Sequence, residues 1–181
     1  MREISLHIID IAENGIAADA DLITIRISES PAENLLKIHV KDNGRGIPGE
    51  MIEKVTDPFF TTRKTRRVGL GLSLFKEAAE RCGGEFGITS PEGTGTEISA
   101  SFMLDHIDLA PMGDLAGSIT CLVMGNPGVD FVYTHEYNER SFTIDTREIK
   151  RELDGFPVNT PEVLRFITDM IRTSLKELKE I

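Results

Sequence analysis

The chain has 181 residues, of which 40% are hydrophobic and 28% charged, and its formal net charge is −10. That length fits one domain, or one domain with a small second one, and is enough to bury a hydrophobic core. Nucleic acid and anionic membranes bind basic surfaces, so the net charge argues against both as the main partner. An anionic ligand would have to be held by local groups.

Cysteine usage and the first residues predict the cellular location. Cys82 and Cys121 form no CxxC pair and are too few for a disulfide scaffold or a zinc site. The first residues contain acidic side chains and no uninterrupted apolar stretch, so they do not resemble a signal peptide. No segment approaches the length of about 18 apolar residues that a membrane span needs. We therefore expect a cytoplasmic protein without a membrane span.

The first hundred residues predict alternating helices and strands from the spacing of their apolar residues. Helical spacing predicts a helix over 5–20, and two alternating runs predict a hairpin of strands over 22–28 and 35–40. The next predicted elements are a short helix over 49–57, a loop over 58–67, a helix over 70–82, and strands over 85–90 and 96–104. The glycine pair that follows residue 82 is expected to end its helix.

The rest of the chain predicts a linker and a small α/β unit. Residues 105–117 lose periodicity and contain a proline and two glycines, which is typical of a linker. The pattern then predicts strands over 118–125 and 129–145, the second with a hairpin turn at Asn138–Glu139, and helices over 146–155 and 160–181. Thr146 and Thr160 are the expected N-caps of these helices. An apolar row on the last helix predicts core packing or a dimer interface: Val163, Phe166, Ile167, Met170, Ile171, Leu175 and Leu178.

Two polar residues share a face of the first predicted helix. Asp10 and Asn14 are four residues apart, which places one above the other. A carboxylate and an amide in this arrangement can hold a cation and a water molecule. A solvated helix face gives the same pattern, so the pair alone does not decide between these alternatives.

The stretch KDNGRGIP, from Lys41 to Pro48, ends a strand with an aspartate and then places two glycines two residues apart. A hairpin turn needs only one Asn-Gly pair, so the second glycine indicates that something lies against the bare backbone. With Gly49 the stretch also matches GxGxxG. That dinucleotide fingerprint requires a parallel βαβ unit and an acidic residue about 20 positions on. Here a loop follows the helix, so a Rossmann dehydrogenase that binds NADH fits poorly.

Two further stretches suit an anion. Four of the five residues from Arg63 to Arg67 are basic. A cationic loop in an acidic protein suits a polyphosphate, although a solvated loop gives the same pattern. Gly69 and Gly71 precede a predicted helix, where unobstructed backbone N–H groups form an anion site. No GK[ST] follows, so this stretch is not a P-loop.

Five stretches follow one another along the chain: DIAEN, DNGRGIP, DPFFTTR, GLGLSL and GTGTE. Together they closely resemble the N, G1, F, G2 and G3 boxes of the GHKL family, which includes histidine kinases, gyrase-type topoisomerases, ninety-kilodalton heat-shock chaperones and mismatch-repair ATPases. The resemblance covers roughly Ile4 to Phe102 and is nearest to sensor-kinase catalytic domains. It implies an α/β (α+β) two-layer sandwich of the GHKL or Bergerat type, with a mixed sheet under helices. We expect an ATP-binding domain over 1–104, a linker over 105–117 and a small C-terminal α/β domain over 118–181.

The resemblance also implies roles for residues in these boxes. Asp42 would accept a hydrogen bond from the adenine amino group, Gly44 and Gly46 would let adenine approach the backbone, and Asn14 would coordinate Mg²⁺. The other residues implied to contact the nucleotide are Ile47, Arg63, Lys64, Gly69, Leu70, Gly71, Leu72 and Thr96.

At Asp10 the sequence departs from the family pattern. Kinases of this family usually carry Asn or His at the position, and gyrase and mismatch-repair members carry the Glu that activates the attacking water. Aspartate is one methylene shorter than that Glu. We expect Asp10 to be the catalytic base rather than Glu13, which points about 100° away around the helix. Phe59 and Phe60 are expected to anchor the lid in the core.

The resemblance implies an enzyme of signalling that binds Mg²⁺ and ATP. It would hydrolyse ATP or transfer the γ-phosphate to a partner protein. The chain begins at the N box, so we expect neither a phosphoacceptor hairpin nor autophosphorylation, and the sheet edge would be trimmed or completed by another chain. His39, His106 and His135 lack the context of a phosphoacceptor, and His7 lies within the N-box helix, where we expect a structural role. The alternative is a nucleotide-gated protein-binding module with little catalysis, and a homodimer through the C-terminal region is a further prediction.

Overall fold

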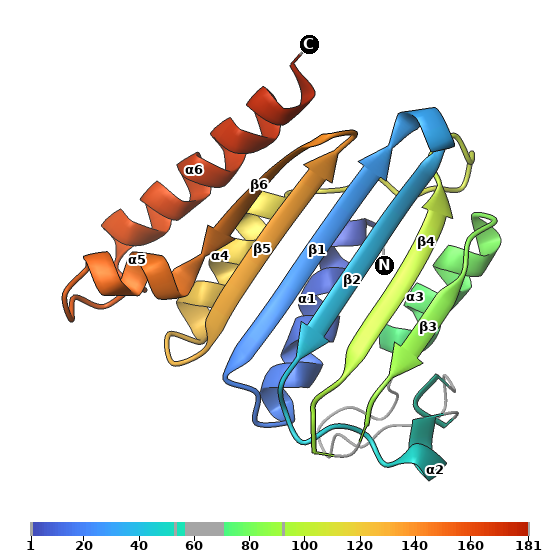
Figure 1. Cartoon of the computed structure of the whole chain (residues 1–181), viewed down its shortest axis with the longest axis horizontal. Coiled ribbons are helices and arrows are strands. Elements are labelled where there is room, and N and C mark those ends of the chain that lie inside the picture. The colour runs from blue at the N-terminus through green and yellow to red at the C-terminus, as the bar shows by residue number, and fades with distance from the viewer. Residues whose placement is uncertain (1, 53, 57–70, 92, 181) are drawn as a thin grey trace.

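The computed structural model describes residues 2–52, 54–56, 71–91 and 93–180. Six strands form one mixed sheet in the order β3-β4-β2-β1-β5-β6 (Figure 1). The strands are β1 (Leu22–Ser30), β2 (Leu35–Asp42), β3 (Phe86–Thr89), β4 (Glu97–Met103), β5 (Asp130–Tyr137) and β6 (Arg140–Asp145). The helices are α1 (Ile4–Ala17), α2 (Gly49–Ile52), α3 (Gly71–Arg81), α4 (Leu115–Gly125), α5 (Thr146–Glu152) and α6 (Pro161–Lys179). Two 3₁₀ turns, η1 (Pro31–Glu33) and η2 (Lys54–Thr56), complete the described elements.

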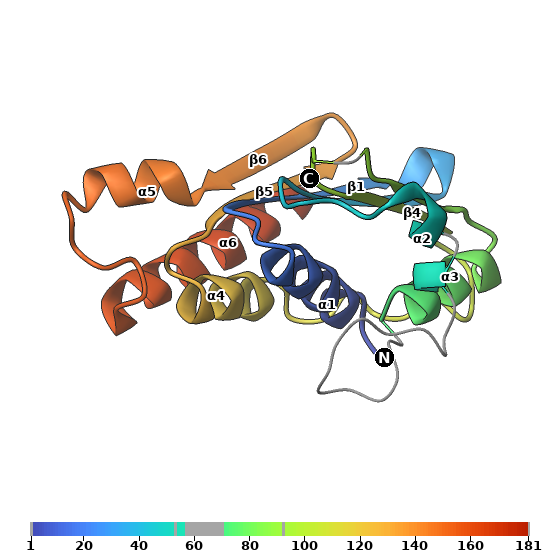
Figure 2. The same ribbon diagram turned by 90° about the horizontal axis from the view of Figure 1, so that it is seen from below.

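One face of the sheet is covered by helices. Figure 2 shows α1, α3, α4 and α6 in a layer beneath the strands, with α5 at the level of the sheet beside β6. The opposite face carries polar side chains such as Arg26 and His39. This arrangement confirms the predicted α/β sandwich with a mixed sheet under helices.

The hairpin of β1 and β2 follows from the alternation of its apolar residues. Ile23, Ile25 and Ile27 have no exposed surface and face the helices, because successive side chains of a strand point to opposite faces. The strands pair antiparallel, with Ile25 opposite Val40. The connection ends at Asn34 in the left-handed conformation, with φ of 55°. The hairpin fills the centre of the sheet, as predicted.

Helices α1 and α3 close the core over these strands. Helix α1 buries Ile4, Ile8 and Ile11 on one side, as its apolar spacing predicts. From α3, the fully buried Phe75 places its ring against the rings of His7, Phe86 and Phe102, with centroids 5.1, 6.2 and 5.7 Å apart. The helix predicted over 49–57 is instead split into the short elements α2 and η2.

The segment over 118–125 is a helix, so its prediction as a strand is wrong. Helix α4 begins at Leu115, within the predicted linker, and Asp114 caps it by accepting a hydrogen bond of 3.0 Å from the Gly117 amide. A short apolar run does not distinguish a buried strand from a buried helix. Here Leu115, Ile119 and Leu122 recur at helical spacing and are buried.

Helix α5 corrects a second prediction, the cap at Thr146. The N-cap is Asp145, whose carboxylate accepts from the Arg147 amide at 2.9 Å. The Thr146 hydroxyl instead accepts from the Phe131 amide at 2.8 Å and so joins α5 to the start of β5. Thr160 occupies the N-cap position of α6, as predicted, but its hydroxyl makes no capping hydrogen bond and has no partner among the described residues.

The C-terminal elements continue the sheet of the first hundred residues. Strand β5 pairs with β1 in parallel, with Ile25 opposite Tyr133, and β6 pairs antiparallel with β5 beyond it. The predicted hairpin turn lies between β5 and β6, with Asn138 at φ of 54°. One sheet therefore runs through both predicted units, and the division of the chain at residues 104 and 118 stays a prediction.

A buried polar chain joins the end of α6 to β1 and β5. The Tyr133 hydroxyl lies 2.7 Å from Nδ1 of His135, and Nε2 of His135 lies 2.7 Å from a Glu29 carboxylate oxygen. The Lys179 ammonium donates to the same carboxylate at 2.9 Å. The last residue of helix α6, Lys179, is thus bonded to Glu29 of strand β1. Within the described ranges, neither α6 nor any other helix has the length and apolarity that a bilayer crossing requires.

Candidate functional site

The predicted site residues Asp42 and Thr96 lie side by side at the ends of β2 and β4. The Asp42 amide donates to the Thr96 carbonyl at 2.9 Å, which adds one more rung after the Lys41 and Glu97 pair. The Asp42 carboxylate oxygen Oδ1 accepts from the amides of Gly44 at 2.8 Å and Thr96 at 3.3 Å. Asp42 is only 9% exposed, and no described residue bonds its other oxygen, Oδ2. Backbone amides therefore hold Oδ1 of the carboxylate, and Oδ2 remains available as a hydrogen-bond acceptor.

The two glycines of DNGRGIP are required by the protein itself. A Cβ on Gly44 would lie 2.6 Å from the Ala18 carbonyl oxygen. Gly46 has φ of 77°, and its Cβ would lie 3.2 Å from the Ser90 hydroxyl. Close packing of the turn and a left-handed backbone therefore account for both glycines. Contact of either with adenine stays a prediction.

The loop after Asp42 is tied to the end of α1. The Asn43 side chain accepts from the amides of Asp21 and Leu22 at 3.1 and 3.0 Å. The Arg45 amide donates to the Ala18 carbonyl at 3.0 Å, and its guanidinium pairs with Asp19 at 2.7 Å. These bonds fix the backbone that carries the predicted nucleotide contacts.

Ser90 lies outside the five predicted stretches and joins two of them, DNGRGIP and GTGTE. Its hydroxyl accepts from the Ile47 amide at 2.7 Å, lies 3.0 Å from the Gly95 carbonyl oxygen, and lies 3.0 Å from the Thr96 hydroxyl. Ser90 is 6% exposed. It therefore connects the turn after β2 with the turn before β4.

A second unselected residue, Gly15, sets the distance between α1 and the strand ends. Its Cβ would lie 2.7 Å from Cβ of Asp42 and 2.9 Å from Cδ1 of Ile23. An isolated glycine inside a helical pattern is the signal that could have found it, because such a glycine often marks a close approach. The helix could not pass Asp42 this closely with any larger residue.

Asp10 faces the first residue of α3. A Cβ on Gly71 would lie 1.6 Å from Oδ2 of Asp10, so the carboxylate and the start of α3 are in direct contact. Asn14 follows one turn later on α1, and both side chains are half-buried, whereas Glu13 is exposed. Helix N-termini favour negative charge, which suits this position of the carboxylate. The structure thus brings together Asp10 and Gly71, two of the residues predicted from separate stretches.

The remaining predicted contacts divide into two groups. Leu72 is 8% exposed and belongs to the hydrophobic core, so its side chain contributes packing. Six residues lie outside the described part of the chain: Phe59, Phe60, Arg63, Lys64, Gly69 and Leu70.

The oxygen donors of α1 suit magnesium. Mg²⁺ binds oxygen ligands and is held in nucleotide sites by one or two protein groups together with phosphate oxygens and water. The carboxylate of Asp10 and the amide of Asn14 are groups of this kind, four residues apart on α1. The described ranges contain no cluster of three or more His, Cys, Asp or Glu that could hold a metal without phosphate.

His7 lies one turn before Asp10 on the buried side of α1. It is 2% exposed, and no described residue hydrogen-bonds its Nδ1 atom. Burial lowers the pKa of His7 from 6.5 to about 4. The imidazole is therefore neutral at pH 7 and serves as part of the core beside Phe75.

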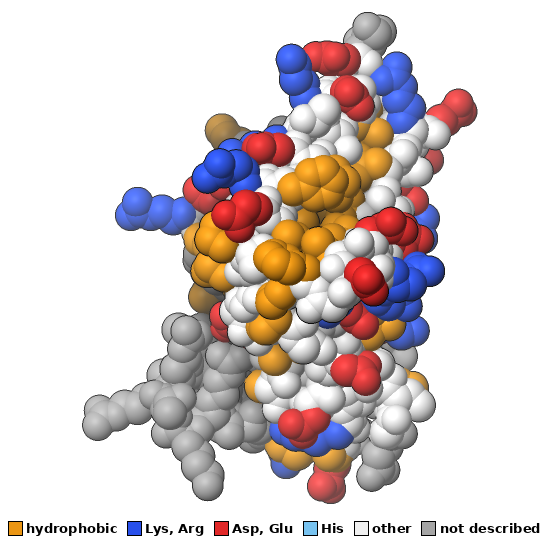
Figure 3. Space-filling view, turned by 90° about the vertical axis from the view of Figure 1, so that its left-hand side faces the viewer, with side chains coloured by type: hydrophobic (Ala, Val, Ile, Leu, Met, Phe, Trp, Pro, Cys, Tyr) orange, Lys and Arg blue, Asp and Glu red, His pale blue; other side chains and the backbone are white. Residues whose placement is uncertain are grey.

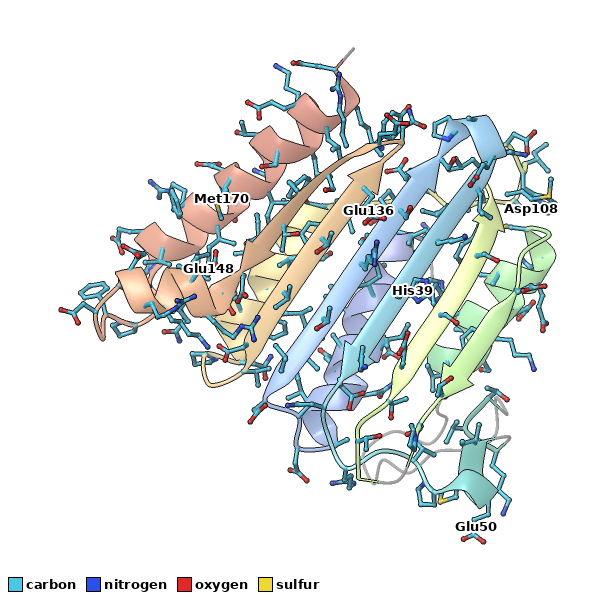
Figure 4. All side chains as sticks on the ribbon, viewed as in Figure 1. His39, Glu50, Asp108, Glu136, Glu148 and Met170 are labelled. Atoms are coloured by element: carbon cyan, nitrogen blue, oxygen red, sulfur yellow. The ribbon has the colours of Figure 1, made fainter. Side chains whose placement is uncertain are left out.

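A hollow of about 470 Å³ lies on the open face of the sheet, away from Asp42 and Thr96. Figure 4 shows His39 and Glu136 on this face. The hollow is lined by Thr24, Arg26, Ser28, Lys37, His39, Lys41, Glu97 and Glu136. Strand alternation points Lys41 and Glu97 to this face and their neighbours Asp42 and Thr96 to the other. Its acids are paired with its bases, Arg26 with Glu136 at 2.5 Å and Lys41 with Glu97 at 3.9 Å.

Sensor kinases are similar in sequence to part of this chain. The chain is 43% identical over 82 residues to the sensor histidine kinase WalK of Bacillus subtilis, a match that covers 42% of this chain and 13% of that protein. It is 37% identical over 91 residues to the sensor protein kinase WalK of Staphylococcus aureus, covering 48% of this chain and 22% of that protein. The chain therefore matches less than a quarter of the length of these relatives.

Two solved structures share the fold. The Aquifex aeolicus MutL ATPase domain complexed with ADP aligns over 100% of both chains, with a TM-score of 0.53 and 14% identity. The N-terminal domain of a DNA repair protein aligns over 80% of this chain and 52% of its own, with a TM-score of 0.55 and 14% identity. Residues 1–106, more than half of the chain, match the family model for the histidine kinase-, DNA gyrase B-, and HSP90-like ATPases. The chain belongs to this family, the one that its five sequence boxes indicate.

Proposed function

We propose that this protein binds Mg²⁺ and ATP beside the ends of β2 and β4 and transfers the γ-phosphate to water or to a partner protein. The observation that carries the proposal is the arrangement of Asp42. Two backbone amides hold Oδ1, so Oδ2 is an acceptor in a fixed direction. An acceptor in a nearly buried position suits the amino group of adenine, and such a charged hydrogen bond contributes about 1.5–3 kcal/mol.

The proposed chemistry uses the contact between α1 and α3. The nucleophile, a water molecule or a side chain of the partner, gives its proton to Asp10. Its oxygen or nitrogen then bonds the γ-phosphorus as the bond from that phosphorus to the bridging oxygen breaks, which leaves ADP. Amides at the start of α3 suit the phosphate oxygens. Magnesium bound through Asn14 would supply positive charge against the phosphates.

Two variants separate binding from chemistry. We expect Asp42→Asn to weaken ATP binding by at least about tenfold, because the amide replaces a charged acceptor. Asp10→Asn should retain binding and lose turnover. Calorimetric titration of Mg·ATP and an assay of ADP formation measure the two properties. Asp108→Asn is the control, since Figure 4 shows Asp108 at the other end of the sheet. Unchanged ATP affinity in Asp42→Asn would overturn the adenine assignment.

The fate of the phosphate distinguishes an ATPase from a kinase. Purified protein is incubated with ATP labelled at the γ-phosphate, alone and with cell extract. Label recovered as free phosphate from the purified protein supports hydrolysis. Label on another protein, absent with Asp10→Asn, supports transfer to a signalling partner. Binding without either product supports the second candidate function.

The second candidate is a nucleotide-gated protein-binding module, and the surface of α6 favours it. Phe166 is 59% exposed, and the partly buried Val163 and Met170 lie on the same side of the helix. Figure 3 shows hydrophobic side chains gathered in the middle of this side of the molecule, with charges around them. Such a patch on a helix suits contact with another protein.

A second copy of the chain is the partner that the charges of α6 suit. Glu162 and Arg172 lie five residues before and after Ile167, and Arg165 and Asp169 lie two residues before and after it. Two antiparallel α6 helices centred there would place each acid opposite a base of the other copy. Sedimentation with and without Mg·ATP tests this. We expect Phe166→Asp to abolish any dimer and Phe156→Asp, an equally exposed phenylalanine outside α6, to retain it. A monomer in both conditions would reject the pairing.

A further inference from the structure

The open face of the central strands carries basic side chains between two acidic ones. The hollow of about 470 Å³ on this face spans four neighbouring strands, β4, β2, β1 and β5. Its bases come from the two middle strands: Arg26, Lys37, His39 and Lys41. Its acids, Glu97 and Glu136, come from the outer strands β4 and β5 (Figure 4). Positive charge therefore gathers in the middle of this face, in a chain whose formal net charge is −10.

Lys37 is the base of this face whose charge is not compensated by a neighbour. The other three bases each lie at ion-pair distance from Glu97 or Glu136. Lys37 instead lies opposite Ser28 on β1 and Ser101 on β4. Its side chain is exposed, and no described residue forms an ion pair with it. An exposed ammonium between two hydroxyl groups can therefore bind an anion from outside the chain.

The spacing of the bases on β2 matches an extended acidic segment. Lys37, His39 and Lys41 occupy every second position of the strand, so their side chains leave the same face about 7 Å apart. In an extended segment of acidic residues, the carboxylates on one side recur at the same interval. Such a segment lying along β2 would place a carboxylate near each base. The acids Glu97 and Glu136 would confine it to the middle strands, because like charges repel.

Other kinds of partner suit this face less well. The residues that line the hollow include no Phe, Tyr or Trp, whereas single-stranded nucleic acid stacks its bases on such side chains. They also include no aliphatic residue, whereas small-molecule pockets are lined mainly by apolar side chains. A broad polyanion such as a nucleic-acid duplex would meet the flanking acids and the net charge of −10. A narrow acidic segment of a protein meets the bases alone.

We propose that the open face of β1 and β2 binds an extended acidic segment of a partner protein, with Lys37 as the central cation. Asp42 and Thr96 point to the opposite face of the sheet, so the inference goes beyond the proposed function and does not depend on nucleotide binding. Lys41 immediately precedes Asp42, and Glu97 immediately follows Thr96. A partner on this face would therefore lie directly behind the strand ends that are proposed to hold the nucleotide.

The test uses a fluorescein-labelled peptide of about ten glutamates, which its own charges keep extended. Fluorescence anisotropy during titration with the full chain, at low salt and without nucleotide, gives the dissociation constant. We expect Lys37→Glu to weaken binding by about fivefold, because a central attraction becomes a repulsion. High salt should abolish binding to the wild type. Lys176→Glu is the control, since it makes the same change of charge at an exposed lysine of α6 and should keep the wild-type affinity.

Two further comparisons identify the binding surface and the class of partner. Arg66→Glu changes a base of the predicted loop over 58–67 and should leave peptide binding unchanged. Loss of binding in Arg66→Glu, with wild-type affinity in Lys37→Glu, would assign the peptide to that loop and overturn the proposal. Labelled oligothymidylate of the same length should bind more weakly than the peptide, and tighter binding would indicate a nucleic-acid partner instead. A wild-type chain that does not bind the peptide at low salt would also reject the proposal, whatever its affinity for ATP.

Discussion

Gly15 lies where α1 passes closest to Asp42. A methyl group there would lie within 2.9 Å of side-chain atoms of Asp42 and Ile23, both held by strands. We expect Gly15→Ala to lower the free energy of unfolding by about 1–3 kcal/mol and to weaken ATP binding, because Asp42 has to move. Urea denaturation and ATP titration measure the two effects. Gly49→Ala is the control, because its added Cβ meets no atom within 4 Å. Wild-type stability and affinity in Gly15→Ala would refute this account of the packing.

His7 makes stability depend on pH. Its pKa is about 4 in the folded chain, against the ordinary value of 6.5, so below pH 6.5 the unfolded chain binds the proton more readily. Its contribution is therefore complete above pH 6.5 and is lost as the pH falls toward about 4. The loss should reach about 3 kcal/mol. Urea denaturation across this range measures it.

The variant His7→Phe keeps a ring beside Phe75 and removes the titrating group. We expect a flatter dependence of unfolding free energy on pH between 6.5 and about 4 than in the wild type. Equal slopes in His7→Phe and the wild type would show that His7 titrates normally.

Some of the site could be predicted residue by residue, and some could not. The order of the boxes identified Asp42 and Thr96, which the structure places side by side. Ser90 was not predicted, because its hydrogen bonds join two turns that are far apart in the sequence and meet only in the folded chain. For Gly44 and Gly46 the pattern predicted a backbone without room for side chains, but the sequence could not show that atoms of the protein itself fill the space around them.

At the scale of elements, the buried Glu29 fixes α6 to the sheet. Burial alone would raise the pKa of Glu29, but hydrogen bonds from His135 and Lys179 lower it overall. The ionised form is therefore stabilised in the folded chain. This contribution is present above pH 4.5, the ordinary pKa of a glutamate, and is lost as the pH falls below that value.

Replacing Glu29 should loosen the end of α6. We expect Glu29→Gln to lower the free energy of unfolding by about 2–4 kcal/mol near pH 7, because a partner of buried charges is lost. The difference from the wild type should shrink as the pH falls below 4.5. Chemical denaturation at several pH values measures this. Glu136→Gln breaks an exposed pair with Arg26 and should cost less than about 1 kcal/mol. Equal losses in the two variants would contradict the anchoring role of Glu29.

Helices and strands could be predicted correctly where the apolar spacing extends over many residues. The prediction failed where the apolar run is short. Helix α1 and the hairpin of β1 and β2 follow directly from their spacing. Helix α4 has 11 residues and many β-branched or apolar ones, so its middle resembles a buried strand. The Asp114 cap, placed before an apolar run, was the local signal for a helix.

At the scale of the whole molecule, β5 covers the edge of β1. Helix α1 also depends on the segment after β4, since the amides of Ile4 and Ser5 donate to the carbonyls of Pro111 and Met112 at 3.0 and 2.9 Å. We expect a fragment of residues 1–104 to lack cooperative unfolding and to aggregate, because the β1 edge is exposed. Circular dichroism during heating measures this. Adding residues 105–181 as a separate chain should restore cooperativity. A sharp transition in the fragment alone would support an independent domain over 1–104.

The fold class was predictable because five boxes fix the first hundred residues, while the sheet order was not. Pairing of β1 with β5 joins residues about a hundred positions apart, such as Ile25 and Tyr133. No local pattern encodes a contact at that separation. The apolar strand β5 was visible in the sequence, but its neighbour was not.

The pairing of β1 with β5 also has a consequence for synthesis on the ribosome. At about 5–20 residues per second, β1 emerges about 5–20 s before the strand that will protect it. During that interval the open edge could recruit the same strand of another nascent chain. Arg26 is a charged residue in the middle of β1, and charged side chains at an open strand edge disfavour pairing with another chain, so we expect Arg26 to reduce such recruitment until β5 emerges.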